Sequence, residues 1–285
     1  MQEAAGLGLP SHRGGGLPLV ASVGGVRVGI TLPQFRHEAD PSFAVAHQAE
    51  AAGLDGVFVF DHLWPLRQPE RPALHGLSLL AALAVETDRV VLGPLVARVG
   101  LLPDALLVHS LLTIDRMLGE RFVATLGTGD SSNRDENLAY GVSFPPKAER
   151  LTRLVECCRR LRGAGVRTWV GGNSADVRSV AVSEADGWNG WGSDTTTFAA
   201  QAAGLDVEVS WGGQVLLGGD EDAAAAKLEH HGMRPGLVHG TVADLVKHFE
   251  GLADAGATWA VCAPLDIGVD AGAVELVAEA AAAVQ

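Results

Sequence analysis

Short apolar runs alternate with longer helical patterns along most of this chain, and that alternation restricts the fold more than any other feature. The run Gly56–Phe60, GVFVF, lacks polar alternation, which is typical of a parallel strand covered on both faces. Eight strand–helix pairs follow one another without a linker, and 285 residues suit one such unit. The sequence therefore predicts an α/β fold, a single-domain (β/α)8 TIM barrel. An open doubly wound sheet is the alternative, although no G-x-G-x-x-G follows the first strand.

The expected barrel occupies residues 26–285, after a Gly- and Pro-rich stretch at residues 1–25 that we interpret as a flexible leader. The expected strands are Val26–Leu32, Gly56–Phe60, Arg89–Ala97, Arg121–Leu126, Arg167–Gly171, Gly187–Trp191, Val207–Leu217 and Thr258–Pro264. The expected helices are Asp40–Gly53 with Asp40 as N-cap and Pro41 at N1, Leu77–Glu86, Pro103–Leu118, Lys147–Arg162, Ala175–Ala185, Thr195–Ala203, an inserted Asp222–His231, Val242–Ala255 and Val269–Val284.

The charge balance restricts the partners of the chain. A formal net charge of −13 disfavours nucleic acid and anionic membranes as partners. No apolar run is long enough to span a bilayer, and the first 25 residues lack the pattern of a signal peptide. The odd count of cysteines, Cys157, Cys158 and Cys262, argues against a disulfide framework and is consistent with core positions in a reducing cytoplasm.

Polar residues that directly follow predicted strands are the first candidates for a site, because barrels of this kind place catalysis at the carboxyl ends of their strands. Asp61 and His62 follow the second expected strand. An imidazole suits proton transfer because it titrates near neutral pH. The pair fits either a proton-transfer site or a strand-end histidine that is satisfied by local hydrogen bonds.

Two loops with glycine follow later strands. Residues 126–133, LGTGDSSN, combine Gly127 and Gly129, which allow close backbone approach to a ligand, with the carboxylate of Asp130. The loop Gly171–Ser174, GGNS, precedes an expected helix, where free N–H groups bind anions such as phosphate. An ordinary turn is the alternative for the first loop, and a plain loop capped by its own side chains is the alternative for the second.

Other polar residues give weaker signals. Arg98 ends the third expected strand and is interpreted as a solvated rim residue, although it could reach an anion. His230, His231 and His239 lack the spacing of metal ligands, so no metal site is expected. Cys262 lies on an expected strand and is interpreted as a core residue rather than a nucleophile.

At these residues the chain resembles the luciferase-like superfamily, and in particular the branch that uses the deazaflavin coenzyme F420. The segment FVFDHLW, residues 58–64, resembles the strand-two motif of that branch. DRMLGERF and LGTG follow in the family order, and GGNS matches the loop that binds the phosphate of the coenzyme. The resemblance covers roughly Val26 to the C-terminus and also implies a homodimer, for which the helix Pro103–Leu118 would be a contact surface.

The resemblance implies hydride transfer between C5 of F420 and a small-molecule substrate, with His62 as general acid or base, Asp61 holding His62 in place, and Asp130 as a second acid/base or an orienting group. It also implies a cis peptide at Leu95-Val96, in a bulge of the third strand behind the coenzyme ring. The implied coenzyme-binding residues are Leu95, Val96, Ala97, Thr128, Gly129, Asp130, Gly171, Gly172, Asn173, Ser174 and Trp191.

The chain departs from the family pattern in three places. Asp130 stands where F420-dependent members often carry Glu, and the segment Gly192–Asp206 is shorter than the insertion that helps to form the substrate pocket in relatives. The lysines that bind a sugar phosphate in glucose-6-phosphate members have no match, which disfavours that substrate. Two rival functions stay open: an FMN-dependent monooxygenase of the same superfamily, and a non-catalytic flavin-binding barrel.

Overall fold

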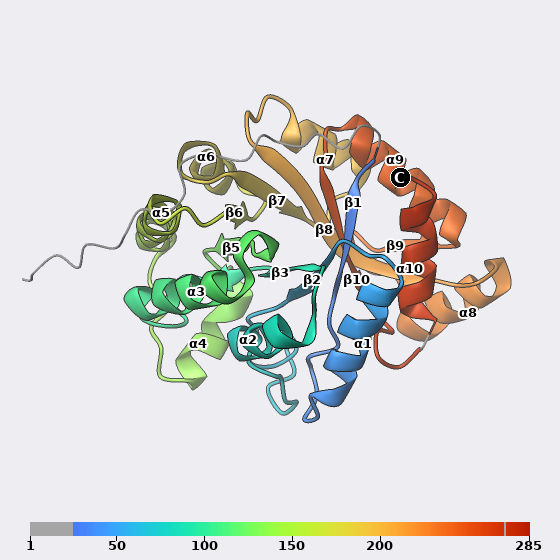
Figure 1. Cartoon of the computed structure of the whole chain (residues 1–285), viewed down its shortest axis with the longest axis horizontal. Helices are drawn as coiled ribbons and strands as arrows, with labels where there is room; N and C mark the ends of the chain where they lie inside the picture. The colour runs from blue at the N-terminus through green and yellow to red at the C-terminus, as the bar shows by residue number, and fades with distance from the viewer. Residues whose placement is uncertain (1–24, 271) are drawn as a thin grey trace, which may run out of the picture.

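The computed structural model describes residues 25–270 and 272–285, and it shows parallel strands enclosed by helices (Figure 1). The sheet order is β3-β2-β1-β10-β8-β7-β6-β5-β4, with β9 paired to β8, and every strand pair is parallel. The strands are β1 (Arg27–Thr31), β2 (Gly56–Val59), β3 (Val91–Pro94), β4 (Ala97–Arg98), β5 (Ala124–Gly127), β6 (Thr168–Gly171), β7 (Gly187–Trp191), β8 (Glu208–Leu217), β9 (Val238–Gly240) and β10 (Trp259–Pro264).

The barrel closes through the third expected strand, which is divided into β3 and β4. β3 pairs with β2, β4 pairs with β5, and a parallel bridge joins Leu92 to Phe122 just before β5. With β3 and β4 taken as one strand, the main ring has the eight parallel strands of a TIM barrel. The predicted fold class is therefore confirmed, and the open doubly wound sheet is excluded.

Helices follow the strands and cover the outside of the barrel (Figure 1). They are α1 (Asp40–Ala51), α2 (Gly76–Glu86), α3 (Asp104–Leu118), α4 (Arg134–Ala139), α5 (Lys147–Gly163), α6 (Ala175–Glu184), α7 (Thr195–Ala202), α8 (Glu221–His231), α9 (Val242–Asp254) and α10 (Ala273–Ala282), with short 3-10 turns η1 (Gly119–Arg121) and η2 (Ser131–Asn133). None of these helices is long and apolar enough to cross a membrane.

Several elements differ from the sequence prediction. The third strand was predicted as one continuous strand but is divided at Leu95-Val96, where the resemblance implied a bulge, and β9 was not predicted. The expected long loop after β5 contains η2 and α4, and α10 begins at Ala273 rather than Val269. Asp40 lies inside α1, because Ala39 is the N-cap and no side chain caps it. The leader predicted at residues 1–25 lies outside the described residues except for Gly25.

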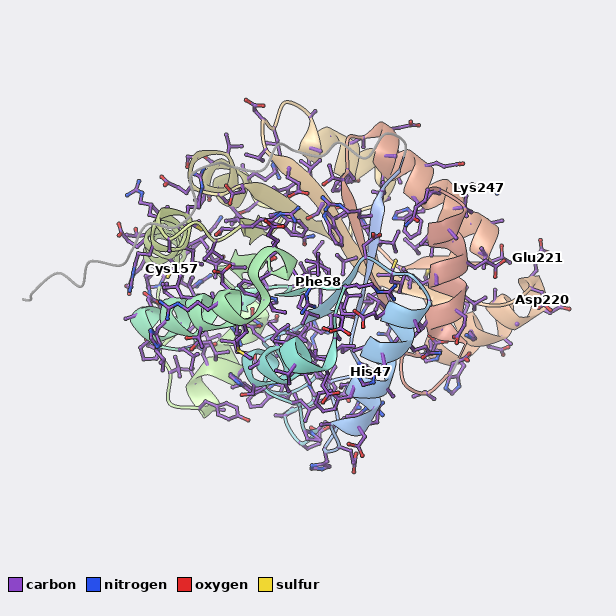
Figure 2. The ribbon with its side chains drawn as sticks, viewed as in Figure 1. His47, Phe58, Cys157, Asp220, Glu221 and Lys247 are labelled. Atoms are coloured by element: carbon purple, nitrogen blue, oxygen red, sulfur yellow. The ribbon has the colours of Figure 1, made fainter. Side chains whose placement is uncertain are left out.

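Large aromatic side chains fill the inside of the barrel. Phe58 lies near the middle of the molecule (Figure 2) and packs against Trp169 and Trp259, with ring centroids 6.3 and 5.9 Å away. A Cβ on Gly29 or Gly56 would approach Phe58 to 2.8 or 2.9 Å, so these strand positions accept only glycine. The interior of the barrel is therefore filled by large aromatic rings, and the glycines that face them leave the space that the rings occupy.

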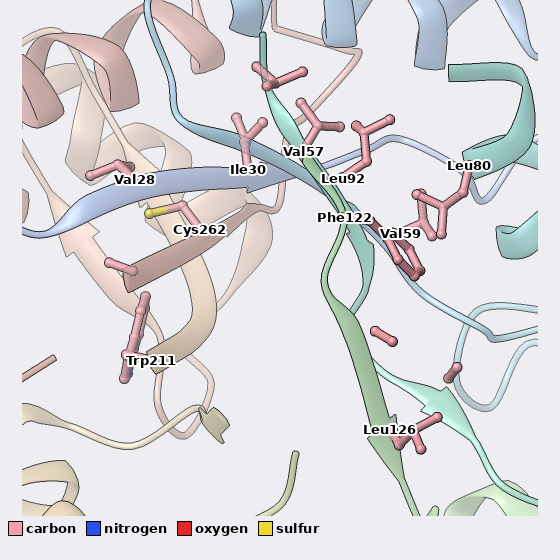
Figure 3. Close-up of a cluster of buried hydrophobic side chains, with 14 of the residues drawn as sticks. Val28, Ile30, Val57, Val59, Leu80, Leu92, Phe122, Leu126, Trp211 and Cys262 are labelled. Atoms are coloured by element: carbon pink, nitrogen blue, oxygen red, sulfur yellow. The ribbon is translucent and has the colours of Figure 1, made fainter. Parts of the chain in front are cut away.

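A second apolar layer lies between the strands and the helices. Figure 3 shows Val28 and Ile30 of β1 beside Cys262 of β10, and Leu80 of α2 beside Val59. These five side chains are fully buried. All three cysteines are buried and free, and burial raises the pKa of Cys157 to about 11 and that of Cys158 to about 12. Their predicted place in or beside the core is confirmed.

The amino ends of the strands meet around one buried carboxylate. Glu208 accepts hydrogen bonds from Arg27 at 3.1 Å, from Arg167 at 2.6 Å, from Trp169 Nε1 at 2.9 Å and from Thr258 at 2.8 Å. These donors come from β1, β6 and the residues that precede β6 and β10. We call Glu208 and these four donors the Glu208 cluster. It lies at the amino ends of the strands, opposite to the end at which barrels of this kind place their active sites.

Candidate active site

The carboxyl ends of the parallel strands bring the predicted site residues to one face of the barrel. Asp61 and His62 follow β2, and the bulge at residues 95–97 lies between β3 and β4. The loop with Thr128, Gly129 and Asp130 follows β5, the loop Gly171–Ser174 ends β6, and Trp191 ends β7. Strand direction alone therefore explains how segments distant in sequence reach one face.

The centre of this face is a buried carboxylate that the sequence interpretation missed. Glu136 lies on α4, and its side chain is 2% exposed. Its Oε2 accepts a hydrogen bond from Arg98 Nη1 at 2.8 Å and lies 3.2 Å from Nδ1 of His62. Its Oε1 accepts from the backbone N–H of Leu63 and, at 3.3 Å, from that of Trp64. We call Glu136, Arg98, His62 and Asp61 the Glu136 cluster.

The electrostatics of the cluster keep Glu136 ionised. Burial raises the pKa of this carboxyl, but the hydrogen bond with His62 and the positive charge of Arg98 outweigh burial and lower the pKa to about 2. Glu136 is therefore a carboxylate, and hence only an acceptor, at any pH at which a barrel of this type would work.

Arg98 is not the solvated rim residue that the sequence predicted. Its side chain is 2% exposed and lies between two carboxylates: Nη1 bonds Glu136, and Nε is 3.4 Å from Asp61. The loop after β5 packs directly on its aliphatic part, because a Cβ on Gly129 would lie 2.6 Å from Cδ of Arg98. The correction has a physical reason, since a buried arginine is tolerated only where carboxylates surround it.

The two predicted acids have partners other than those expected. Asp61 was expected to hold His62, but its Oδ2 accepts from the backbone N–H of Arg98 at 2.6 Å, and Glu136 contacts His62 instead. Asp130 is exposed, and its Oδ1 accepts from the backbone N–H of Ser132 at 2.8 Å as the cap of η2. Asp61 therefore positions Arg98, and Asp130 shapes its own loop.

The bulge of the third strand has the predicted geometry. The Leu95-Val96 peptide is cis, which confirms that prediction. The side chain of Val96 fills the space over two neighbouring strands, since a Cβ on Gly127 or Gly171 would overlap its methyl groups. Two glycines of the predicted site are thus explained by the approach of Val96.

The predicted phosphate loop is fastened to the end of β7. The side-chain amide of Asn173 donates to the backbone oxygen of Trp191 at 2.8 Å and accepts from its N–H at 3.0 Å. Gly172 has φ +137°, a conformation that favours glycine. Ser174 is the N-cap of α6, but its side chain makes no capping hydrogen bond to the first-turn N–H groups.

Aromatic side chains line the face between His62 and Trp191. The ring of Phe60 lies 6.5 Å from that of His62 and meets Trp191 edge-on at 5.7 Å. Gln34, fully buried after β1, holds the backbone of Phe60 through a donated and an accepted hydrogen bond of 2.9 and 2.7 Å. The aromatic rim is therefore held by a buried amide that the sequence interpretation also missed.

The missed residues had a recognisable signal only in one case. The run from Arg134 to Ala139, RDENLA, follows Asn133 and places Asp135 and Glu136 in a first helical turn, where acids are favoured. This pattern predicts a short helix, whereas nothing local predicts the burial of Gln34. Among the described residues, no group of three or more His, Cys, Asp and Glu side chains is arranged to hold a metal ion.

The fold and this face define a class: TIM-barrel proteins with ionisable groups and glycine loops at the carboxyl ends of the strands. Residues 26–165 match the model of the luciferase-like monooxygenase family. This match makes the first half of the chain similar to the luciferase-like superfamily, and the curated relatives of that part are named as F420-dependent enzymes.

Three similar proteins illustrate this placement. A Kineococcus radiotolerans protein named F420-dependent glucose-6-phosphate dehydrogenase is 36% identical over 121 residues, which are 42% of this chain and 34% of the relative. The aligned part is thus about a third of the length of the curated relatives that the chain matches.

Two solved structures share the fold. An F420-dependent secondary alcohol dehydrogenase with an F420-acetone adduct has a TM-score of 0.76 at 15% identity, and covers 92% of this chain and 99% of its own. The FMN complex of a type II Baeyer-Villiger monooxygenase component from Pseudomonas putida has a TM-score of 0.66 at 14% identity, with coverage of 91% and 98%. At these identities the likeness concerns the fold alone.

Proposed function

We propose that this chain is an F420-dependent oxidoreductase that transfers a hydride between the coenzyme and a small organic substrate. The observation that carries the proposal is the partly exposed imidazole of His62, held by Glu136 at the carboxyl ends of the strands in a chain whose curated relatives are named F420-dependent dehydrogenases. F420, when bound, would supply the hydride chemistry, and the barrel would supply position and electrostatics.

The loop before α6 fits a phosphate group. Its N–H groups have no side-chain cap, Asn173 and Ser174 are exposed, and Gly172 keeps the backbone accessible. The one acid in the first turn of α6, Asp176, is paired with Lys147 at 2.6 Å, which reduces its repulsion of an anion. The phosphate would therefore lie at β6, and the reacting end of the coenzyme would lie near the bulge and His62.

His62 would give or take the proton of the reacting substrate group, since its ring is 20% exposed and faces the aromatic rim. Asp130 would act as a second acid/base or orienting group after release from its cap. Leu95, Val96, Ala97 and Thr128 would contact the coenzyme, together with Trp191.

The substrate stays unnamed within this proposal. Glucose-6-phosphate is the first compound to assay because of the names of the relatives. The structure supplies no spare lysine for its phosphate, since Lys147, Lys227 and Lys247 each have a carboxylate within 4 Å. A neutral alcohol is the second compound to assay. Because no lysine is free to bind a phosphate group, we expect the alcohol to be turned over faster than glucose-6-phosphate.

An FMN-dependent monooxygenase is the second candidate, favoured by the family match and by the FMN-bound neighbour. Titration of the purified protein with F420 and with FMN separates the two, and we expect saturable binding of F420 at lower concentration. Gly172→Val, with strained backbone and a side chain at the phosphate loop, should weaken that binding. Gly141→Val, at a glycine with positive φ but nothing nearby, is the matched control. Preferential binding of FMN would contradict the proposal, and binding of F420 without turnover of any donor would favour a non-catalytic barrel.

We also propose a homodimer in a reducing cytoplasm. The outward face of α3 exposes Leu106 and Met117, which are 49% and 45% exposed. A monomeric mass in solution at micromolar concentration would contradict the dimer.

A further inference from the structure

The two ring nitrogens of His62 have different surroundings. Nδ1 lies 3.2 Å from Oε2 of Glu136, whereas none of the described residues forms a hydrogen bond with Nε2. Nε2 is therefore the nitrogen left for a ligand. Which nitrogen carries the proton in the neutral ring depends on what Glu136 can accept or donate.

Glu136 is an obligate acceptor because three of its four partners can only donate. Arg98 and the backbone N–H groups of Leu63 and Trp64 can only donate. These three contacts fix the position of the carboxylate without any help from His62. A fixed carboxylate next to Nδ1 requires that Nδ1 carry a hydrogen.

We propose that Glu136 is the positioning residue of this site: it holds neutral His62 as the Nδ1–H tautomer, so that the lone pair of Nε2 faces the substrate and exchanges its proton. The proton that leaves the reacting substrate group forms the N–H bond at Nε2, and in the reverse direction the same bond is broken. Because it assigns Nε2 this task, the inference rests on the proposed function of His62.

Arg98 and Asp61 complete the arrangement as a second layer. Arg98 is clamped by the Asp61 carboxylate, which accepts its backbone N–H at 2.6 Å and lies 3.4 Å from its Nε. Arg98 then presents Nη1 to Glu136. The charges are therefore ordered from Asp61 through Arg98 to Glu136; Arg98 and Glu136 are 2% exposed, whereas the imidazole of His62 is 20% exposed and can be reached by a ligand.

The near-isosteric variant Glu136→Gln tests the proposal. Both oxygens of a carboxylate accept hydrogen bonds, whereas a glutamine amide has one oxygen that accepts and one NH2 group that donates. If its oxygen stays on the N–H groups of Leu63 and Trp64, its NH2 group faces His62 and Arg98. The backbone donors cannot change, whereas an imidazole can move its proton. We expect Glu136→Gln to convert neutral His62 to the Nε2–H tautomer and so to remove the lone pair that faces the substrate.

The measurement is the set of ¹⁵N chemical shifts of the histidine rings in the coenzyme-free protein, with His62 assigned by its absence in His62→Gln. Wild type should show Nδ1–H and Glu136→Gln should show Nε2–H. Glu208→Gln is the matched control, since it alters an equally buried glutamate in the Glu208 cluster and should leave the wild-type tautomer of His62.

Turnover gives the second readout. Loss of the correct tautomer should reduce the rate per bound coenzyme by about 10²–10⁴-fold, and F420 affinity should change little. An Nε2–H tautomer in wild type would overturn the inference, as would retention of Nδ1–H in Glu136→Gln. A wild type that does not bind F420 would overturn the proposed function, whereas the chemical shifts would still report on Glu136 and His62.

Discussion

The barrel buries one glutamate at each end, and the two differ in what surrounds them. Glu208 receives donors from strands and from residues next to strands, and both of its arginines lie over tryptophan rings, at 4.6 Å for Arg27 over Trp259 and 5.4 Å for Arg167 over Trp169. Glu136 comes from a short helix outside the ring of strands.

The two carboxylates also differ in the donors that they serve. Around Glu208, the donors are two guanidinium groups, an indole and a hydroxyl. Around Glu136, one partner is the partly exposed imidazole of His62, and Nη2 of Arg98 has no hydrogen-bond partner within residues 25–270 and 272–285. The comparison shows that similar buried ion pairs can stabilise the barrel at one end and position a candidate catalytic histidine at the other.

The sharpest test of this difference is removal of the imidazole. His62→Ala should reduce turnover by about 10²–10⁴-fold, because general acid/base catalysis is lost. F420 affinity should stay nearly normal, since the phosphate is expected at the loop before α6. Loss of binding with an intact rate per bound coenzyme would reverse the assigned roles. The unfolding free energy, measured in parallel, should fall by about 1 kcal/mol, because Glu136 loses one partner but keeps Arg98 and the two backbone donors.

Removal of the other carboxylate should have the opposite pattern. Glu208→Ala removes the carboxylate that Arg27 and Arg167 share, although Asp55 stays near Arg27, and should lower the free energy of unfolding by about 3 kcal/mol. Urea unfolding measures this loss. F420 affinity of the folded fraction should be unchanged. A loss below about 1 kcal/mol would show that the Glu208 cluster does not stabilise the barrel.

Low pH should lower the free energy of unfolding through protonation of Glu136. Its pKa is lowered from 4.5 to about 2, so its contribution to stability is complete above pH 4.5 and is lost as the pH falls toward 2. The shift corresponds to about 3 kcal/mol in total, of which about 2 kcal/mol disappears between pH 6 and pH 3. Unfolding of wild type and of Glu136→Gln at both values isolates this part. Equal acid sensitivity of the two proteins would contradict it.

The smallest expected effect concerns a single donor of the Glu208 cluster. Trp169→Phe removes the indole N–H but keeps a ring against Phe58, and should cost about 1–2 kcal/mol because a hydrogen bond to a charged group is lost. Thermal unfolding would detect it. An unchanged stability would mean that the arginines and Thr258 satisfy Glu208 without the indole.

The sequence was informative where structure is local. Apolar runs such as Gly56–Val59 predicted strands, and the order of glycine loops predicted which segments share a face. The division of the third strand at Leu95-Val96 followed only from the family resemblance. The residues His62, Val96 and Gly172 lie where they were predicted to lie.

The missing part of the site depends on contacts between distant residues. Arg98 is buried because Asp61 and Glu136, 37 and 38 positions away, pair with it. A lone arginine at a strand end gives no sign of such partners. The run that carries Glu136 is only six residues long, too short for a periodic pattern to stand out from a loop.

The side-chain amide of Asn173 links the predicted phosphate loop to a fluorescent residue, Trp191. Because its oxygen and nitrogen both form hydrogen bonds with the backbone of Trp191, the loop before α6 and the end of β7 should move together. A movement of that loop toward a bound anion would carry the indole with it and change its contact with the ring of Phe60. We therefore expect the emission of Trp191 to respond to inorganic phosphate alone, and Trp191→Phe to abolish that response.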